Sequence, residues 1–308
     1  MKEGLNEMPK ISVFMITYNH ENFITQAIES VMMQETLFPF ELVIGEDCST
    51  DSTRKICLEY KNKFPDKIKL LLPEKNLGVR ENCKQTMSQC DGDYVAWLEG
   101  DDYWLDKKKL QLQVDFLEAN NECSMCFHRE VIVDEKKIEL SEQWNREIKK
   151  TSSVSDICKG NFICANTVLF RNYDKFIQDF SVDSVVLDWP LWVTLADKGK
   201  IGFIDKKMSV YRVHQGGIFS MKSKAHQYIL GEKAAHVWKK IIGKKKCNNE
   251  FAEIVWFYYG KIIKASLLEG EYTKTIKYII KGVRCIIQYP KASLNALTKK
   301  RPFSKIFF

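Results

Sequence analysis

The sequence predicts an α/β protein in which a mostly parallel central sheet is flanked by helices and followed by a helical C-terminal extension. From residue 11, apolar runs of strand length alternate with segments of helical apolar spacing, which is the pattern of a parallel sheet. Hydrophobic residues make up 45% of the 308 residues and charged residues 28%, so the chain can build a large core and is not intrinsically disordered. We expect residues 1–220 to form the sheet domain and residues 221–308 a basic helical region.

The N-terminal part of the chain supplies the regular elements of this prediction. Apolar runs predict strands over 11–17, 41–45, 68–72 and 94–98. Helical spacing predicts helices over 22–33, 54–64, 79–90 and 107–120. Capping side chains at 49–52 precede the second helix. Because parallel strands need a crossover connection, the alternation favours a parallel sheet.

The remainder of the chain is less regular. Apolar segments predict further strands within 122–140 and 161–170, and the polar residues 141–160 between them predict a loop. Gly216-Gly217 marks the end of the first domain. Beyond it, helical spacing predicts two helices, over 250–268 and 271–287.

The cysteines and the N-terminus indicate a cytoplasmic protein. Of ten scattered cysteines only Cys123 and Cys126 have C-x-x-C spacing, and they lie in an apolar run, so we interpret them as core residues rather than metal ligands. Free thiols are typical of a reducing compartment. The first ten residues lack the apolar segment of a signal peptide, and no apolar run is long enough to predict a membrane-spanning helix. Peripheral attachment to the inner face of the cytoplasmic membrane remains open.

Charge is distributed unevenly along the chain. Residues 221–308 hold 19 Lys and Arg but only 5 Asp and Glu, whereas the rest of the chain is net acidic. Basic residues beside apolar and aromatic ones are typical of an interfacial anchor on an anionic membrane. The alternative is a helical subdomain with a solvated basic face. We do not expect nucleic acid as the partner, because no nucleic-acid-reading motif occurs.

Polar residues follow three of the predicted strands. They are Thr17-Tyr18-Asn19 after the first strand, Glu46-Asp47 after the second and Glu99-Gly100-Asp101-Asp102 after the fourth. In open α/β sheets ligands bind beyond the carboxyl ends of the strands, so these three groups should converge on one crevice.

Two of these groups carry carboxylates suited to a nucleotide ligand. Asp101 and Asp102 repel each other unless a cation holds them, which favours a divalent metal bound together with substrate phosphates; a solvated acidic turn is the alternative. Asp47 could accept a hydrogen bond from a base N–H or a ribose hydroxyl. The glycine patterns of dinucleotide dehydrogenases and P-loop hydrolases are absent from the sequence, so neither class is expected.

Three residues later in the chain are candidates for catalysis or ligand binding. Asp188 lies between an apolar run and two tryptophans, where burial raises a carboxyl pKa and suits a general base; it could also cap the following helix, and both roles can hold. His214 precedes a glycine pair and is either a metal ligand or structural. Arg212 would suit a diphosphate.

These segments together resemble glycosyltransferase family 2, the inverting GT-A enzymes, of the bacterial cell-surface polysaccharide type. The resemblance covers roughly residues 10–220 and rests on ISVFMITYN (11–19), ELVIGEDCSTD (41–51), NLG (76–78) leading to Asn82, GDYVAWLEGDD (92–102), DWPLW (188–192) and YRVH (211–214). Two positions depart from the family pattern: Glu46 stands where Asp is usual, and Cys48 where Gly is common.

The resemblance implies a reaction and a set of site residues. A sugar would be transferred with inversion from a nucleotide-diphosphate sugar, the expected donor being a UDP-sugar. The acceptor would be a hydroxyl of a saccharide or lipid-linked molecule in surface polysaccharide or glycolipid synthesis. Asp188 would be the catalytic base, and Mn²⁺ or Mg²⁺ the cofactor, held by Asp102 and His214. The nucleotide would contact Thr17, Tyr18, Asn19, Asp47, Arg80 and Asp101, and the acceptor or the diphosphate would contact Trp189 and Arg212.

Two other functions compete with this interpretation. One is a non-catalytic, membrane-attached protein that binds nucleotide sugars. The other is a metal-dependent nucleotidyltransferase, which also combines a nucleotide site with a carboxylate-bound metal but releases pyrophosphate.

Overall fold

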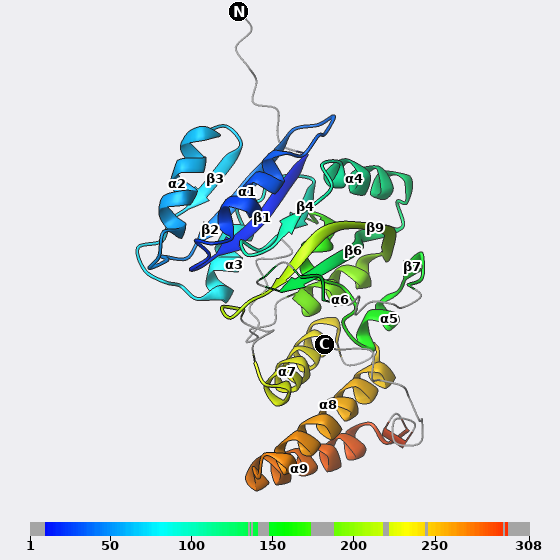
Figure 1. Ribbon diagram of the computed structural model, residues 1–308. Coiled ribbons are helices and arrows are strands. Elements are labelled where there is room, and N and C mark those ends of the chain that lie inside the picture. The colour runs from blue at the N-terminus through cyan, green and yellow to red at the C-terminus, as the bar shows by residue number, and fades with distance from the viewer. Residues whose placement is uncertain are drawn as a thin grey trace, which may run out of the picture. The chain divides into compact units, whose positions relative to one another are not determined.

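The structure of the protein is a computed structural model that describes residues 10–134, 136, 138–140, 148–173, 188–217, 222–243, 246–291 and 293–294. The chain forms two compact units (Figure 1). The sheet unit comprises Met1–Thr151, Ile163–Ser181 and Ile201–Val213, and the helical unit comprises Ser152–Phe162, Val182–Lys200 and His214–Phe308. The expected domain boundary at residue 220 remains a prediction, namely that residues 1–220 fold without the C-terminal region. In the structure, two earlier segments cluster with the C-terminal helices.

One sheet runs through the sheet unit in the order β3-β2-β1-β4-β8-β6-β9-β5. Its strands are β1 (Ile11–Thr17), β2 (Phe40–Glu46), β3 (Ile68–Leu71), β4 (Tyr94–Trp97), β5 (Tyr103–Trp104), β6 (Cys123–Asp134), β8 (Leu169–Arg171) and β9 (Lys200–Val213). A ninth strand, β7 (Thr151–Ser152), lies off this path. The pairs β2–β3, β1–β2 and β1–β4 are parallel, as predicted. Beyond β4 the pairs β4–β8, β6–β8 and β5–β9 are antiparallel.

Helices cover both faces of the parallel strands because side chains alternate along each strand. The helices are α1 (Ile24–Met32), α2 (Thr53–Lys63), α3 (Val79–Met87) and α4 (Lys109–Ala119). Side chains of α1, α2 and α4 belong to the core on one face, together with Val13 and Leu42. Gly45 of β2 points to the other face, where an added Cβ would lie 1.9 Å from Thr86 Oγ1 of α3. The absence of a side chain at Gly45 therefore lets α3 approach the sheet.

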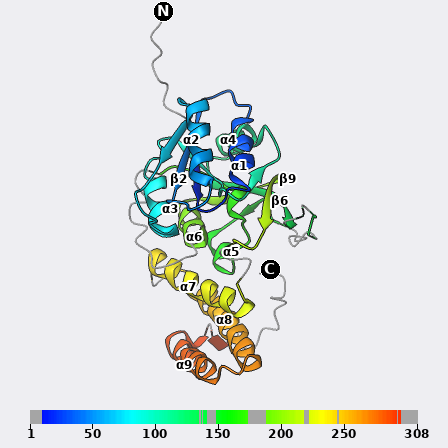
Figure 2. The ribbon, with the colours of Figure 1, turned by 60° about the vertical axis from the view of Figure 1, so that its left-hand side comes forward.

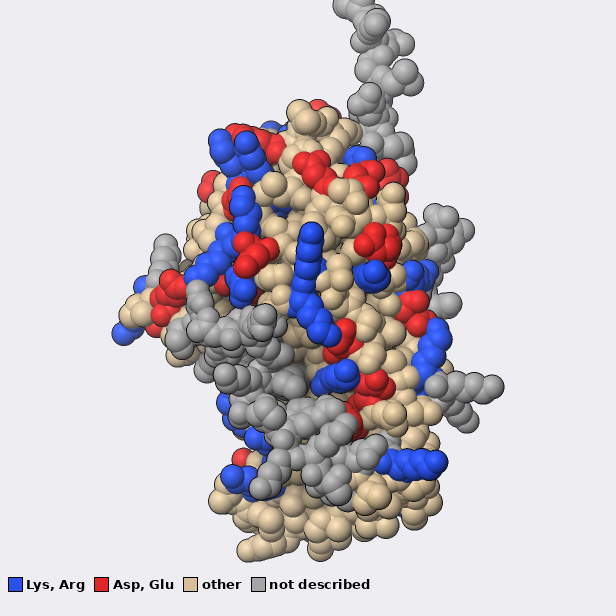
Figure 3. Space-filling view, turned by 90° about the vertical axis from the view of Figure 1, so that its right-hand side faces the viewer, with Lys and Arg blue, Asp and Glu red and all other residues tan. Residues whose placement is uncertain are grey.

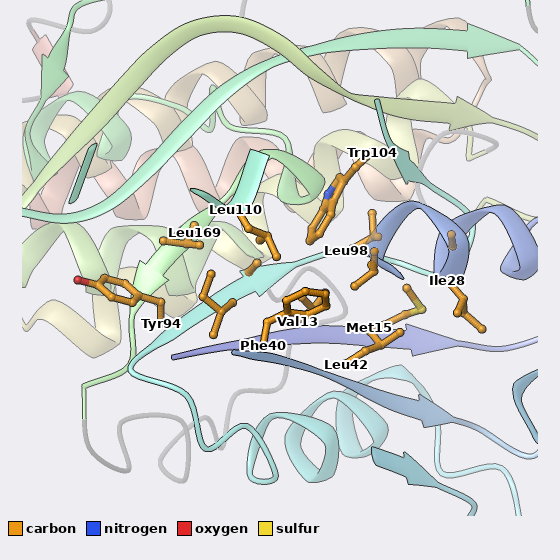
Figure 4. Packing of buried hydrophobic residues seen from close by; sticks show 14 of the residues in the cluster. Val13, Met15, Ile28, Phe40, Leu42, Tyr94, Leu98, Trp104, Leu110 and Leu169 are labelled. Atoms are coloured by element: carbon orange, nitrogen blue, oxygen red, sulfur yellow. The ribbon is translucent and has the colours of Figure 1, made fainter. Parts of the chain in front are cut away.

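The core of the sheet unit is mainly aliphatic and includes the aromatic rings of Phe40, Tyr94 and Trp104. Val13 and Met15 of β1 point toward Ile28 of α1 and Leu110 of α4, and Trp104 closes the same layer (Figure 4). Each of these side chains is at most 1% exposed. Cys123 and Cys126 are buried in β6, and all ten cysteines are free thiols, so the core interpretation of the C-x-x-C pair is confirmed.

The helical unit is built on tryptophan and tyrosine packing. Its helices are α5 (Val154–Cys158), α6 (Asp188–Lys198), α7 (Lys224–Ile242), α8 (Asn248–Leu268) and α9 (Tyr272–Gln288), the last three following one another in space (Figure 2). The Trp189 ring of α6 lies 6.1 Å from that of Trp238 in α7 and 6.4 Å from that of Tyr258 in α8. None of the helices that the structure describes has the length and apolar character needed to cross a bilayer.

Most predicted elements match their observed positions to within a few residues, whereas two predicted segments differ and some observed elements were not predicted. The expected strand 161–170 is a 3-10 turn, η1 (Ala165–Thr167), followed by the short β8. The expected loop 141–160 contains β7 and α5, while 141–147 lie outside the described residues. Neither β9 nor α7 was predicted, because charged residues interrupt the apolar pattern of both.

Candidate active site

The carboxyl ends of β1, β2 and β4 meet at one edge of the sheet. The strands are neighbours in the order β2-β1-β4, and Thr17 is in register with Glu46. The Asp47 N–H donates to the Thr17 carbonyl (3.0 Å), and the Gly100 N–H donates to the Ile16 carbonyl (3.0 Å). A Cβ at Gly100 would lie 2.6 Å from Thr17 Oγ1, so this approach requires glycine. The predicted convergence of the three polar groups is confirmed.

The loops after β1 and β2 are held together by side chains of Asn19 and its neighbours. Asn19 has a left-handed φ of 55°, and its N–H donates to Ser49 Oγ (2.9 Å) while its Oδ1 accepts from the Thr50 N–H (2.9 Å). Thr17 is buried, with Oγ1 3.2 Å from His20 Nδ1, whereas Tyr18 is exposed. Of the residues predicted after β1, Tyr18 therefore has the surface to meet a ligand, and Asn19 fixes the shape of the loop.

Asp47 lies at the end of β2 against a loop from a later part of the chain. Its two carboxylate oxygens accept from the backbone N–H groups of Leu77 (2.7 Å) and Gly78 (3.0 Å). Burial raises the pKa of Asp47, and the two backbone donors oppose this rise. Gly78 has a φ of 80°, which favours glycine, and α3 with the half-buried Arg80 begins directly after it. Asp47 thus positions the turn that leads to Arg80.

Asp102 is a buried acceptor inside the sheet unit. Its Oδ2 accepts from Asn166 Nδ2 (2.8 Å) and its Oδ1 from the Arg212 N–H (2.9 Å). Burial raises the pKa of Asp102 well above its ordinary value, and the charges of Asp101 and Glu99 add to the rise. Because both oxygens bond to the protein interior, the geometry argues against the predicted role of Asp102 as a metal ligand.

Asp101, the preceding residue, has a partly exposed carboxylate. Its Oδ2 lies 3.7 Å from His20 Nε2. The Asp101 carbonyl accepts from the Arg212 guanidinium, which also donates to Gln26 and lies 4.3 Å from the centre of the Tyr103 ring. Arg212 is buried in these contacts, so it positions the Asp101-Asp102 turn; the predicted contact with a diphosphate does not match its burial.

The divalent cation that the resemblance implies can be tested against these residues. Within the described ranges, no group of three or more His, Cys, Asp or Glu side chains forms a metal cluster. Mg²⁺-type sites usually take only one or two carboxylates and complete the shell with substrate phosphates and water. Asp102 fits such a site less well, because it is buried and each of its oxygens already accepts a hydrogen bond from the protein. Asp101 fits it, since its carboxylate is partly exposed at the strand end.

The remaining predicted residues belong to the helical unit. Asp188 begins α6, is half-buried, and accepts from Asn161 Nδ2 at Oδ2 (3.1 Å). Burial raises its pKa, the property expected of a general base. Trp189 is 1% exposed and its Nε1–H donates to the Ile157 carbonyl (3.0 Å), so direct contact with an acceptor does not match its burial. His214 is buried, and its Nδ1 accepts from the Gly216 N–H (3.2 Å).

Three further residues position the site; none was assigned to it from the sequence, although Asn76 lies in the NLG segment (76–78). Asn166 bonds to Asp102, Gln26 bonds to Arg212, and Asn76 donates through Nδ2 to the Asp47 carbonyl (2.9 Å). Asn166 carried a signal, because it is a polar residue within the apolar run Ile163–Phe170. Gln26 carried none, since a glutamine on a helix surface is ordinary.

The fold and the site define the chain as an α/β protein with a cluster of polar side chains at the carboxyl ends of its parallel strands. The family model "Glycosyl transferase family 2" matches residues 12–177, more than half of the chain. The chain belongs to glycosyltransferase family 2.

Relatives and a solved structure agree with this assignment. An uncharacterised protein of Mycobacterium tuberculosis is 36% identical over 68% of this chain, and the match spans 60% of that relative's length. The Bacillus subtilis protein TuaG, named as a teichuronic acid biosynthesis glycosyltransferase, is 25% identical over 96% of this chain and 99% of its own. The crystal structure of Staphylococcus aureus TarS 1-349 in complex with UDP-GlcNAc matches with a TM-score of 0.69 at 21% identity, covering 93% of this chain and 83% of TarS 1-349. This likeness shows the GT-A fold.

Proposed function

We propose that this protein is an inverting glycosyltransferase that moves a sugar from a nucleotide-diphosphate sugar, a UDP-sugar, to an acceptor hydroxyl in surface polysaccharide or glycolipid synthesis. The observation that carries the proposal is the convergence of Thr17, Asp47 and Asp101 at the ends of β1, β2 and β4. Membership of the family supports the reaction class. The UDP-GlcNAc bound to TarS and the name of TuaG support the donor and the polymer.

On the donor side, the proposal gives different tasks to residues at the sheet edge. Tyr18 and Arg80 contact the nucleotide, while Asp47 and Asn19 hold the loops that surround it. A divalent cation, when bound, supplies positive charge to the diphosphate leaving group, and Asp101 rather than Asp102 would hold it. Arg212 and Asn166 keep the Asp101-Asp102 turn in place.

On the acceptor side, Asp188 removes the proton of the attacking hydroxyl. Its raised pKa makes the carboxylate a stronger base than an exposed aspartate, and Asn161 fixes the orientation of the carboxyl group. The deprotonated hydroxyl attacks the anomeric carbon on the face opposite the leaving diphosphate, which inverts that centre. Trp189, the next residue of α6, packs against Trp238 of α7 and thereby positions Asp188.

The test is to incubate the purified protein with single nucleotide sugars, Mn²⁺ and a panel of saccharide and lipid-linked hydroxyl acceptors, and to identify the released nucleotide. We expect release of UDP with one or more UDP-sugars, and loss of that release after chelation with recovery on adding Mn²⁺. Release of pyrophosphate would instead assign a nucleotidyltransferase. A thermal shift with UDP-sugar but no release with any donor and acceptor would assign a non-catalytic binding protein.

A further inference from the structure

Helix α9 presents three distinct faces. One face is buried in the helical unit and consists of Thr275, Tyr278, Gly282 and Cys285. This face packs against α8, where a Cβ at Gly282 would lie 3.1 Å from the Trp256 ring. At 100° per residue these positions cover one side of the helix and leave the others outside the packing. Figures 1 and 2 both show α9 at the periphery of the helical unit.

A second face of α9 is apolar and exposed. It is formed by Ile276, Ile279, Ile280, Val283, Ile286 and Ile287. These residues recur at helical spacing and fall on one stripe, with Ile287 76% exposed and Ile276 57% exposed. Tyr272, the first residue of α9, falls on the same stripe and is 68% exposed, and Leu268 at the end of α8 is 80% exposed. Scattered exposed apolar residues are ordinary, but a contiguous stripe marks an interaction surface.

The flank of this stripe is basic. Lys277 and Arg284 lie beside it on the helix, and no ion pair to either is formed by the residues that the structure describes. Lys274 pairs with Glu271, and Lys281 with Glu232 of α7. Residues 272–294 contain five Lys and Arg and no Asp or Glu. Figure 3, by contrast, shows blue and red side chains interspersed over much of the face that it displays.

We propose that α9 lies in the interface of an anionic lipid bilayer, with its isoleucine stripe in the acyl boundary and Lys277 and Arg284 at the headgroups. An apolar stripe with a basic flank and no acidic residue matches this surface in both polarity and charge. A second copy of the chain matches it less well, because docking two such faces brings two basic flanks together without a counter-charge. The inference goes beyond the proposed function and does not depend on it.

The experiment measures binding of the full chain to vesicles by co-sedimentation at physiological salt. One set of vesicles contains equal parts phosphatidylglycerol and phosphatidylcholine, and the other contains phosphatidylcholine alone. We expect the unmodified protein to sediment with the first set and to stay in the supernatant with the second. Sedimentation with neither set, or equally with both, would overturn the proposal.

Matched variants separate the stripe from general surface effects. The triple variant Ile276→Gln, Ile280→Gln, Ile287→Gln removes apolar contact while keeping helix-favouring residues, and binding should fall roughly tenfold or more. The control is Leu37→Gln, Leu58→Gln, Leu72→Gln, which makes the same chemical change at exposed positions of the sheet unit and should bind unchanged. Equal binding by the two variants would overturn the proposal.

The charge of the flank is tested in the same assay. Lys277→Glu with Arg284→Glu should weaken binding to anionic vesicles roughly tenfold or more, because each basic group near an anionic leaflet contributes about fivefold. Lys55→Glu with Lys84→Glu changes the net charge equally on exposed faces of α2 and α3 and should have a smaller effect.

Two further results would show that the stripe binds a second copy of the chain, or that another segment binds the membrane. Light scattering without vesicles measures the oligomeric state. A dimer for the unmodified chain and a monomer for the Ile→Gln triple variant would show that the stripe binds a second copy of the chain. Deletion of residues 295–308 should leave most of the binding intact. If that deletion abolishes binding while the triple variant retains it, the terminal segment is the anchor and the proposal for α9 is wrong.

Discussion

Asp101 and Asp102 are adjacent in the sequence, but their carboxylates have different surroundings. Asp102 is buried and bonded to Asn166 and to the Arg212 backbone, whereas Asp101 is partly exposed beside His20. The amino-acid sequence shows two acidic residues at a strand end but does not show which carboxylate faces a ligand. The buried carboxylate of Asp102 holds the local structure together, whereas the carboxylate of Asp101 is accessible to a ligand.

This difference predicts opposite phenotypes for the two aspartates. Asp102→Ala should lower the free energy of unfolding by about 2–4 kcal/mol, because two buried donors lose their acceptor. Asp101→Asn should change it by less than about 0.5 kcal/mol but lower the turnover number roughly a hundredfold. Urea denaturation and UDP-release assays measure the two effects. Asp102→Ala with unchanged stability and no turnover would restore Asp102 as the metal ligand.

Asp188 predicts a pH dependence of the chemical step. The carboxylate acts as a base only when deprotonated, and burial raises its pKa above the ordinary value of 3.8, so the rate should fall on acidification at a pH above that value. Asp188→Asn should slow single-turnover transfer roughly a hundredfold or more and remove this acid limb. The donor affinity, measured by titration calorimetry, serves as the control and should stay nearly constant. A variant that unfolds but keeps its rate per folded molecule would make Asp188 purely structural.

At the scale of elements, the packing of helices depends on where a glycine permits close approach. Gly231 of α7 faces Tyr258 of α8, and an added Cβ would lie 2.4 Å from the phenol ring. Gly260 of α8 is also helical, but apart from the helix's own backbone no atom of the described residues lies within 4 Å of an added Cβ there. The two glycines therefore look alike in sequence and differ in packing.

This contrast predicts opposite signs for the same substitution. Gly231→Ala should lower the free energy of unfolding by about 1–3 kcal/mol through overpacking. Gly260→Ala should raise it by about 0.5–1 kcal/mol, because alanine loses less backbone entropy on folding. Urea denaturation of both variants gives the two values. A stabilising Gly231→Ala would contradict the close packing of α7 on α8.

At the scale of the whole molecule, the two compact units are not consecutive in the chain. Segments 152–162 and 182–200 cluster with α7 and α8, and the Trp189 ring of α6 packs on Trp238 and Tyr258. A cut at the predicted boundary of residue 220 therefore removes the partners of a buried tryptophan.

We expect the fragment 1–220 to unfold at a lower temperature than the full chain and to bind a hydrophobic dye, because α6 loses its cover. Differential scanning fluorimetry and dye binding compare the fragment with the full chain. A fragment that melts at the same temperature as the full chain and binds no dye would confirm the boundary at residue 220 as a true domain boundary.

The amino-acid sequence was sufficient to predict the parallel half of the sheet and the meeting of three polar strand ends at one edge. Apolar period and turn residues act locally, so β1, β2 and α4 appear at their predicted positions, and strand ends in a parallel sheet must share an edge. Three features follow from the folded structure alone: Asp102 is buried, Arg212 holds the Asp101-Asp102 turn, and the isoleucines of α9 are exposed. These properties depend on Asn166, Gln26 and Trp256, which are far away in the sequence and meet those residues only after folding.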